Sequence, residues 1–223
     1  MKRSICAVFD IDDTLYLERD YVQSGFEAVG HWVAKWVGIE DFAARCWLRF
    51  IAGERRSIFD DALRECGKEP SSDLVSALVE IYRTHEPAIS LAEDVPEALQ
   101  AILSMASIAV VSDGPLVSQS RKVNALGLDV FAKPIVLTAV FGSKYSKPHS
   151  KAFEHVAQCR PADVYLYVAD NPLKDFAAPK QLGWVTVRVR RPGGLCYSME
   201  SAEITPDHEM GDCSGLPEIL VQL

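Results

Sequence analysis

Three aspartates stand close together near the start of the chain, directly after a short apolar run. Residues 9–16 read FDIDDTLY, so Asp10, Asp12 and Asp13 follow the apolar residues 5–8. Carboxylates this close repel one another and resist removal from water, so the arrangement costs stability unless a cation binds there. Hard cations such as Mg²⁺ take carboxylate oxygens as ligands. The stretch therefore raises the question of which cation binds at the end of the first strand.

Further polar residues follow later apolar runs. Ser112 and Gly114 lie in VVSDG, Lys147 lies in YSKPHSKAF, and Asp170 and Asp175 lie in YVADNPLKD. The Ser112 hydroxyl and the Gly114 N–H can donate to phosphate oxygens, and Lys147 adds a positive charge. The two aspartates add oxygen ligands for a hard cation. The set predicts a phosphate site beside Mg²⁺.

Phosphoryl transfer explains why these groups occur together. A carboxylate that attacks a phosphate is repelled by it, and Mg²⁺ together with Lys147 offsets that repulsion. Asp12 can then give a proton to the leaving oxygen and take one from the water that attacks the aspartyl phosphate.

A parallel α/β sheet is the element pattern that positions these residues. Apolar runs typical of strands buried on both faces occur at residues 5–9, 108–111, 135–140, 164–168 and 184–189. Helical patterns lie between the later runs, at residues 116–126, 151–158 and 173–182. Ligands bind at the carboxyl ends of parallel strands, so the polar residues at those ends are expected to converge on one crevice.

A helical segment interrupts this pattern after the first strand. Four apolar stripes of helical period begin at Val22, Phe42, Phe59 and Leu74. Glycines that suit helix ends punctuate the stripes at Gly38, Gly53 and Gly67. We therefore expect an α/β catalytic core of residues 1–16 and 90–223, and a four-helix insertion of residues 17–89.

Composition limits the partners. The 223 residues are 48% hydrophobic and 24% charged, as in an ordinary globular protein, and the net charge of −8 argues against a nucleic-acid partner. The first apolar run ends at Asp10, too early for a signal peptide, and residues 99–112 are too short to span a bilayer. We expect a cytoplasmic protein that acts on a small metabolite and binds no membrane. The oligomeric state stays open.

Cysteine and histidine chemistry is not indicated. The six cysteines are scattered without a CxxC pair or metal-ligand spacing, and the five histidines are dispersed. We expect reduced, mostly buried thiols and no histidine-based mechanism.

In their order along the chain, the motifs resemble the haloacid dehalogenase (HAD) superfamily of aspartate-nucleophile phosphatases, and the resemblance covers nearly the whole chain. The family's D-x-D-x-T motif appears at residues 10–14, its Ser/Thr motif at Ser112, its lysine motif at Lys147 and its acidic motif at residues 170–175. The insertion is similar to the family's α-helical cap (subfamily I type), which closes over the site and helps to select substrate. The resemblance implies a Rossmann-like core with an inserted cap, and a phosphoric monoester hydrolase.

The resemblance also implies a role for each motif residue. Asp10 would be the nucleophile and a metal ligand, and Asp12 the acid/base, with its backbone carbonyl on Mg²⁺. Asp170 would bind the metal, and Asp175 would do so directly or through water. The phosphate-stabilising side chains would be Thr14, Ser112 and Lys147.

Two features depart from the family pattern, and two favour phosphatase chemistry. Ala169 stands where the family commonly has glycine, and Pro179 is expected to bend or break the last predicted helix. The family's dehalogenases lack the second aspartate, which this chain keeps as Asp12. Its mutases tend to have valine in the place of Thr14.

Two other functions fit the sequence less well than a phosphatase does. A receiver-like signalling module would want its lysine after the last strand, whereas Lys147 precedes Asp170. A phosphometabolite-binding regulator on the same fold is disfavoured because Asp10 and Asp12 are intact. Within the enzyme interpretation a sugar phosphate, a nucleoside monophosphate and a phosphorylated sugar acid all remain admissible substrates.

Three further predictions concern loops. Arg55 and Arg56 lie between the second and third apolar stripes, where either could meet a second anionic or hydroxyl-rich part of the substrate, or both could simply be solvated. Asp13 is expected to be a turn or capping residue. Residues 191–216 are expected to form irregular surface chain without a function.

Overall fold

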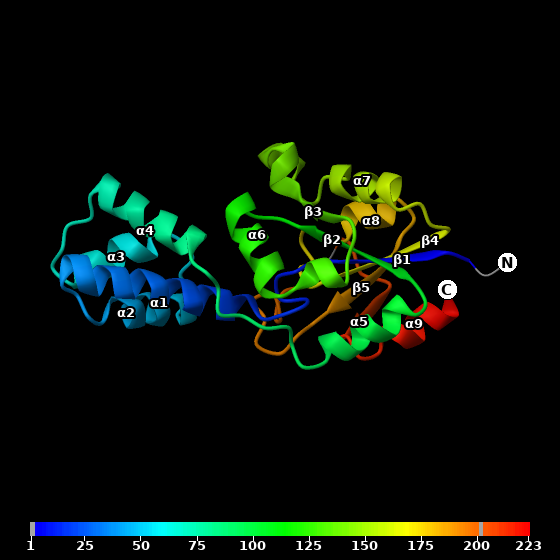
Figure 1. The fold of residues 1–223 in the computed structure, drawn as a ribbon, viewed down its shortest axis with the longest axis horizontal. Helices are drawn as coiled ribbons and strands as arrows, with labels where there is room; N and C mark the ends of the chain where they lie inside the picture. The colour runs from blue at the N-terminus through cyan, green and yellow to red at the C-terminus, as the bar shows by residue number, and fades with distance from the viewer. Residues whose placement is uncertain (1–2, 201–202) are drawn as a thin grey trace. The chain divides into compact units, whose positions relative to one another are not determined.

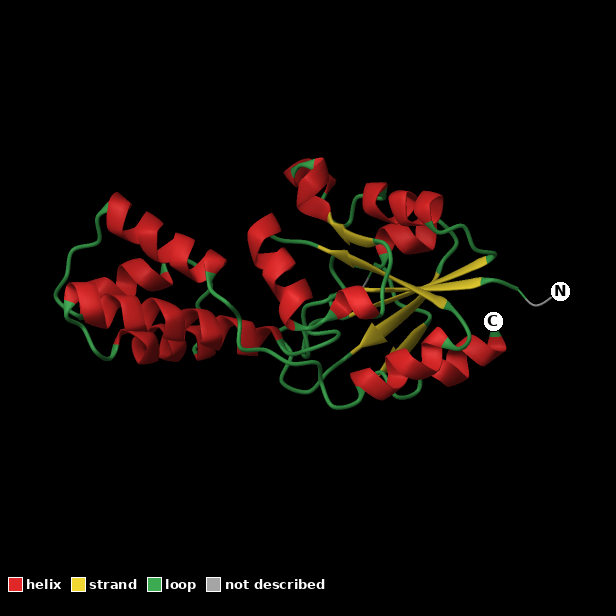
Figure 2. Ribbon diagram, in the orientation of Figure 1, coloured by secondary structure: helices red, strands yellow, loops and turns green. Residues whose placement is uncertain are grey.

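The computed structural model describes residues 3–200 and 203–223. The chain divides into two compact units, one made of Met1–Arg19 with Ile89–Leu223 and the other of Asp20–Ala88. In the described residues the first unit holds the strands, and the second is built from helices (Figure 2). The second unit lies within the expected insertion, residues 17–89.

The first unit is built on a parallel sheet, as predicted for an α/β fold. Its strands, in the order β3-β2-β1-β4-β5-β6, are β1 (Ile5–Phe9), β2 (Ser107–Ser112), β3 (Ile135–Leu137), β4 (Val164–Ala169), β5 (Val185–Val189) and β6 (His208–Met210). The central strand β1 pairs with β2 and β4, and Phe9 lies opposite Val110 and Val168. This order differs from the flavodoxin-like order expected of a receiver module.

Helices cover both faces of this sheet (Figure 1). They are α5 (Val95–Leu103), α6 (Leu116–Ala125), α7 (Lys151–Cys159), α8 (Ala177–Gln181) and α9 (Leu216–Gln222). Figure 1 shows α7 and α8 on one side of the sheet and α5 and α9 on the other. Cys6 and Val8 of β1 belong to a buried cluster with Phe153 and Val156 of α7. Since successive strand residues point to opposite faces of the sheet, β1 is buried on both faces.

The second unit contains four helices that share an aromatic core. Each predicted apolar stripe lies on one helix: α1 (Glu18–Val37), α2 (Phe42–Ile51), α3 (Ile58–Glu65) or α4 (Ser72–Thr84). Phe26 of α1 contacts the rings of Phe50, Phe59 and Tyr82 edge-on or tilted. Among the described residues of the whole chain, no helix is both long and apolar enough to cross a bilayer.

Two predicted elements are shorter than their apolar pattern suggested. The run at residues 135–140 is strand only to Leu137 and continues as the 3₁₀ turn η2 (Thr138–Phe141). The helix predicted for residues 173–182 begins only at Ala177, so Pro179 lies in its first turn instead of breaking it. Proline is tolerated there because the first N–H groups of a helix have no partner within it.

The prediction of irregular surface chain at residues 191–216 is wrong in part. The segment includes β6, which pairs with β5, and the side chains of Arg191, Cys196 and Cys213 are buried. Residues 201 and 202 lie outside the described residues. The strand was missed because the sequence HEM carries no apolar alternation, and its pairing at the sheet edge is made by backbone groups.

Candidate active site

Three of the predicted site residues meet at the carboxyl ends of β1, β2 and β4. The chain passes from β1 to β2 and β3 on one side of the sheet, and then returns to β4 on the other side of β1. Such a reversal leaves a crevice outside the strand ends. Asp10 follows β1, Ser112 ends β2 and Asp170 follows β4, so the sheet itself brings these three residues together.

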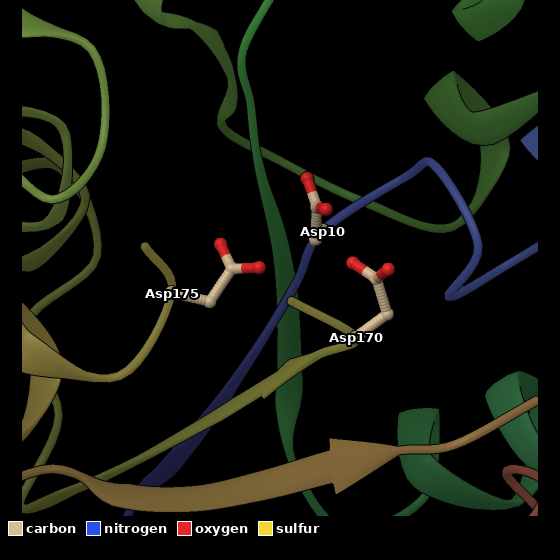
Figure 3. A group of neighbouring side chains, drawn as sticks. All are labelled: Asp10, Asp170 and Asp175. Carbon is tan, nitrogen blue, oxygen red and sulfur yellow. The ribbon is translucent and has the colours of Figure 1, made fainter. Parts of the chain in front are cut away.

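Three buried carboxylates form the acidic cluster of this crevice (Figure 3). Asp10, Asp170 and Asp175 each offer an oxygen within 4.8 Å of the others, and they come from the ends of β1 and β4 and from the loop after β4. Burial raises the pKa of Asp10 to about 6. Burial, together with the charges of Asp10 and Asp175, raises the pKa of Asp170 to about 8. A divalent cation would relieve both effects.

Lys147 supplies one positive charge to the cluster. Its side chain is fully buried, and its Nζ lies 2.9 Å from Asp10 Oδ1 and 2.6 Å from Asp175 Oδ1. Nζ also donates to the hydroxyl of Tyr167 at 3.1 Å. Burial opposes the charge, but the two carboxylates more than offset it and hold the pKa of Lys147 well above its ordinary value. Lys147 is therefore not a solvated surface lysine.

Asp175 is held more firmly than its motif position suggests. Its Oδ1 accepts from Lys147 and, at 3.1 Å, from Tyr167, and its Oδ2 accepts from the Asn171 N–H at 3.0 Å. These bonds fix the loop after β4 and the position of the lysine. Tyr167 was not predicted because a tyrosine inside an apolar strand is ordinarily a core residue.

Two hydroxyls in the site are buried without a partner. Thr14 Oγ1 and Ser112 Oγ find no hydrogen-bond acceptor or donor in the described protein, and both residues are almost fully buried. Unpaired buried hydroxyls cost free energy, so they indicate a ligand. Gly114 follows Ser112 with φ +133°, a conformation that favours glycine. Phosphate oxygens match these donors, and the acidic cluster matches a divalent cation.

Asp12 is surrounded by donors. Lys122 Nζ and the Tyr16 hydroxyl donate to Oδ1 at 2.6 Å and 2.5 Å, and Gln119 Nε2 donates to Oδ2 at 2.9 Å. Burial acts to raise the pKa of Asp12, but the Lys122 charge and these hydrogen bonds more than offset it, so the pKa lies below its ordinary value. Asp12 is thus held as a carboxylate.

Asp13 does more than the predicted turn. Its φ of +53° is a left-handed turn conformation, as expected, but its carboxyl group is buried. Oδ1 accepts from the Glu18 N–H at 2.8 Å, and Oδ2 accepts from the Leu195 N–H at 2.6 Å. Asp13 therefore ties the loop after β1 to the loop after β5.

Two buried arginines, which the sequence did not single out, support the same loops. Arg191 pairs with Asp94 at 2.6 Å and donates to the Thr14 carbonyl at 2.9 Å. Arg188 of β5 donates through Nε to the Asp170 carbonyl at 3.1 Å. Each arginine donates a hydrogen bond to the backbone carbonyl of a predicted site residue. The C-terminal part of the chain therefore helps to hold the site loops in place.

Arg55 and Arg56, predicted to select substrate, belong to the second unit and are both exposed. The Arg55 guanidinium donates to the carbonyls of Phe50 and Glu54 at 2.6 and 2.7 Å and lies 4.1 Å from the centre of the Phe50 ring. The bond to the Phe50 carbonyl caps the carboxyl-terminal turn of α2. Substrate recognition by either arginine stays a prediction.

Comparison of the amino-acid sequence with models of known protein families identifies the family of this chain. The family model of haloacid dehalogenase-like hydrolases matches residues 6–183. The chain belongs to this family. The resemblance inferred from the motifs is confirmed, and so is the Rossmann-like fold of a HAD-like hydrolase. Curated relatives named phosphatases agree with the predicted enzyme class, a phosphoric monoester hydrolase.

Two curated relatives cover most of this chain. A glyceraldehyde 3-phosphate phosphatase of Methanocaldococcus jannaschii is 25% identical over 227 residues, which cover 97% of this chain and 96% of the relative. A glyceraldehyde 3-phosphate phosphatase of Methanopyrus kandleri is 28% identical over 174 residues, which cover 74% of this chain and 72% of that protein.

Solved structures share the fold of this HAD-like hydrolase. The HAD-hydrolase YfnB from Bacillus subtilis, bound to magnesium, has a TM-score of 0.70 at 20% identity, covering 98% of this chain and 99% of its own. The 2-haloacid dehalogenase from Pseudomonas syringae has a TM-score of 0.68 at 21% identity, with the same coverage. These similarities support the fold alone.

Proposed function

We propose that the protein is a Mg²⁺-dependent phosphatase that hydrolyses a small sugar phosphate through an aspartyl phosphate on Asp10. One observation carries the proposal. Three buried carboxylates and a buried lysine lie in contact range of one another, and in the described residues the hydroxyls of Thr14, in the loop after β1, and Ser112, at the end of β2, are buried without a hydrogen-bond partner. A divalent cation would relieve the repulsion between the carboxylates, and a phosphoryl group would satisfy the hydroxyls.

The chain offers a donor set suited to Mg²⁺. Asp10 and Asp170 would hold the ion directly, and Asp175, whose oxygens already accept from Lys147, Tyr167 and Asn171, would support it through water. When bound, the ion would neutralise charge on the phosphoryl oxygens and orient them toward the nucleophile.

The protein side chains divide the reaction between them. Lys147, Thr14 and Ser112 would hold the phosphoryl oxygens while a carboxylate oxygen of Asp10 attacks phosphorus and the bond to the leaving oxygen breaks. Asp12, which would carry the proton taken from water in the preceding turnover, would pass it to that leaving oxygen. Asp12 would then accept a proton from the water that attacks phosphorus, which breaks the acyl-phosphate bond and regenerates Asp10.

The substrate class rests on the relatives and on two motif residues. Both curated relatives are named for a three-carbon sugar phosphate, which favours a sugar phosphate over a nucleoside monophosphate. Asp12 and Thr14 are present, which favours a phosphatase over the dehalogenase and mutase branches of the family.

The free cysteines support the predicted cytoplasmic location.

A substrate panel tests the proposal. We expect phosphate release from glyceraldehyde 3-phosphate, glycerol phosphate and related sugar phosphates in Mg²⁺, and loss of release in EDTA. The kcat/KM values for nucleoside monophosphates should be lower. Preferred hydrolysis of nucleoside monophosphates would contradict the substrate class, and no hydrolysis of any phosphomonoester in Mg²⁺ would contradict the function.

The stability of the metal-free protein to unfolding should fall as the pH rises, and Mg²⁺ should offset this loss. The pKa values of Asp10 and Asp170 are raised on folding, to about 6 and about 8, so the folded state binds more protons than the unfolded state and metal-free stability should fall as the pH rises through this range. Since Mg²⁺ binds the ionised groups, its increase in Tm should be larger at pH 9 than at pH 6. Thermal unfolding with Mg²⁺ or EDTA measures this, and an equal increase at both pH values would contradict the metal site.

A further inference from the structure

A lysine and a glutamine on α6 reach the loop that follows β1. Gln119 and Lys122 are three residues apart, so they lie on the same face of the helix, and both are almost fully buried. The amino-acid pattern alone predicts no role for either residue. An ammonium group is costly to bury unless it is paired, and here it lies 2.6 Å from Asp12 Oδ1.

We propose that Lys122, with Gln119 and Tyr16, is a positioning residue that fixes the Asp12 carboxylate for proton transfer and leaves Oδ2 as the oxygen that carries the proton. The proposal rests on the phosphatase function and deepens it. Lys122 acts through Asp12 and is given no contact with the reacting phosphorus.

The choice of oxygen follows from the distribution of donors. A carboxylate oxygen has about two acceptor positions. In the described structure Oδ1 of Asp12 accepts from both Lys122 and Tyr16, whereas Oδ2 accepts only from Gln119. The free acceptor position is therefore on Oδ2. With donors on both oxygens, the carboxyl plane also has little freedom to rotate.

Gln119 also connects Asp12 to the loop after β2, which holds Asp113 and Gly114. Its Nε2 donates to the Asp113 carbonyl at 2.5 Å as well as to Asp12. A Cβ atom added at Gly114 would lie 2.7 Å from the same nitrogen, closer than such contacts allow. The absence of a side chain at Gly114 thus leaves room for Gln119 to join the loop after β2 to the loop after β1.

The leaving group separates positioning of an acid from a structural effect. An alkyl phosphate such as glycerol phosphate needs a proton on its leaving oxygen, whereas 4-nitrophenyl phosphate releases a stable phenolate and needs none. The value of kcat/KM depends only on the steps up to departure of the leaving group, and not on the later hydrolysis of the aspartyl phosphate. It therefore reports on the proton transfer to the leaving oxygen. Lys122→Met should lower kcat/KM about 10²-fold for glycerol phosphate, the loss expected from a misplaced catalytic group, and change it little for 4-nitrophenyl phosphate.

A double-mutant cycle asks whether Lys122 acts through Asp12. Once Asp12→Asn has removed the acid, adding Lys122→Met should change kcat/KM for glycerol phosphate by less than about 2-fold. Both substitutions impair the same proton transfer by Asp12, so their effects on kcat/KM do not add. Tyr16→Phe removes one hydroxyl from Oδ1 and should show the same leaving-group pattern with a smaller loss. Lys144→Met, at an exposed lysine of the 3₁₀ turn η3 (Ser143–Tyr145), is the charge-matched control and should match wild type.

Three results for variants that carry Lys122→Met would overturn the positioning role. They are equal losses on both substrates in a folded Lys122→Met enzyme, a multiplicative further loss in the Asp12→Asn background, and wild-type kcat/KM in Lys122→Met. If Asp12→Asn itself hydrolyses glycerol phosphate like wild type, the acid/base role of Asp12 fails, and the positioning role fails with it. Absence of phosphatase activity in the wild type would overturn the proposed function directly, so the two failures can be told apart.

Discussion

Replacing Asp10 with asparagine should abolish turnover of every phosphomonoester while the protein stays folded. An amide is a poor nucleophile and a weaker metal ligand than a carboxylate, so both proposed roles of Asp10 are lost together. Steady-state phosphate release measures the activity, and far-UV circular dichroism measures the fold. Burial raises the pKa of Asp10 to about 6, so above this pH the metal-free variant should also unfold at a higher temperature than wild type.

A second substitution controls for the change of charge. Asp129 is an exposed aspartate of the 3₁₀ turn η1 (Leu128–Val130) in the same unit. Asp129→Asn should therefore retain wild-type kcat and KM. Substantial turnover by a folded Asp10→Asn variant would refute the assignment of the nucleophile.

The Asp12→Asn variant should be slowed by about 10²–10⁴-fold, the range typical for loss of a general acid/base. The amide oxygen of the new side chain can still accept from Lys122, but the amide cannot take a proton from water, so the aspartyl phosphate should be hydrolysed slowly. With 4-nitrophenyl phosphate, whose leaving group needs no acid, rapid-quench experiments should show a burst of nitrophenol that approaches one equivalent of enzyme. Covalent phosphate should accumulate at the same rate.

The wild-type enzyme is the reference for this burst. Its aspartyl phosphate should be hydrolysed faster and therefore accumulate less under the same conditions. A steady-state rate equal to that of wild type, or a slow variant without any burst, would show that Asp12 does not activate the attacking water.

The positions of the main site residues were predictable because the motifs lie at strand ends. Asp10, Ser112 and Asp170 each follow an apolar run, and parallel strands carry such residues to one edge of the sheet whatever the details of packing. The order of the motifs then separated this family from receiver-like modules. Local sequence and general topology were sufficient for this part.

The residues that brace the site were not predictable in the same way. Tyr167 and Arg188 lie inside strands, and Lys122 lies within a helix, where the local pattern indicates core packing or a solvated face. Their roles depend on contacts across 20 residues or more of sequence or on a partner in another loop, such as Lys122 with Asp12. Only the folded chain brings these partners together.

Covalent labelling of the nucleophile tests the central claim most directly. In a single turnover of Asp12→Asn with a phosphorylated substrate, the trapped acyl phosphate can be reduced with borohydride, which converts the modified aspartate to homoserine, and the site can be located by peptide mass spectrometry. The proposed mechanism predicts homoserine in place of Asp10 when Mg²⁺ is present and none when EDTA replaces it. Homoserine in place of Asp13 or Asp170, or phosphate release without a modified aspartate, would contradict it.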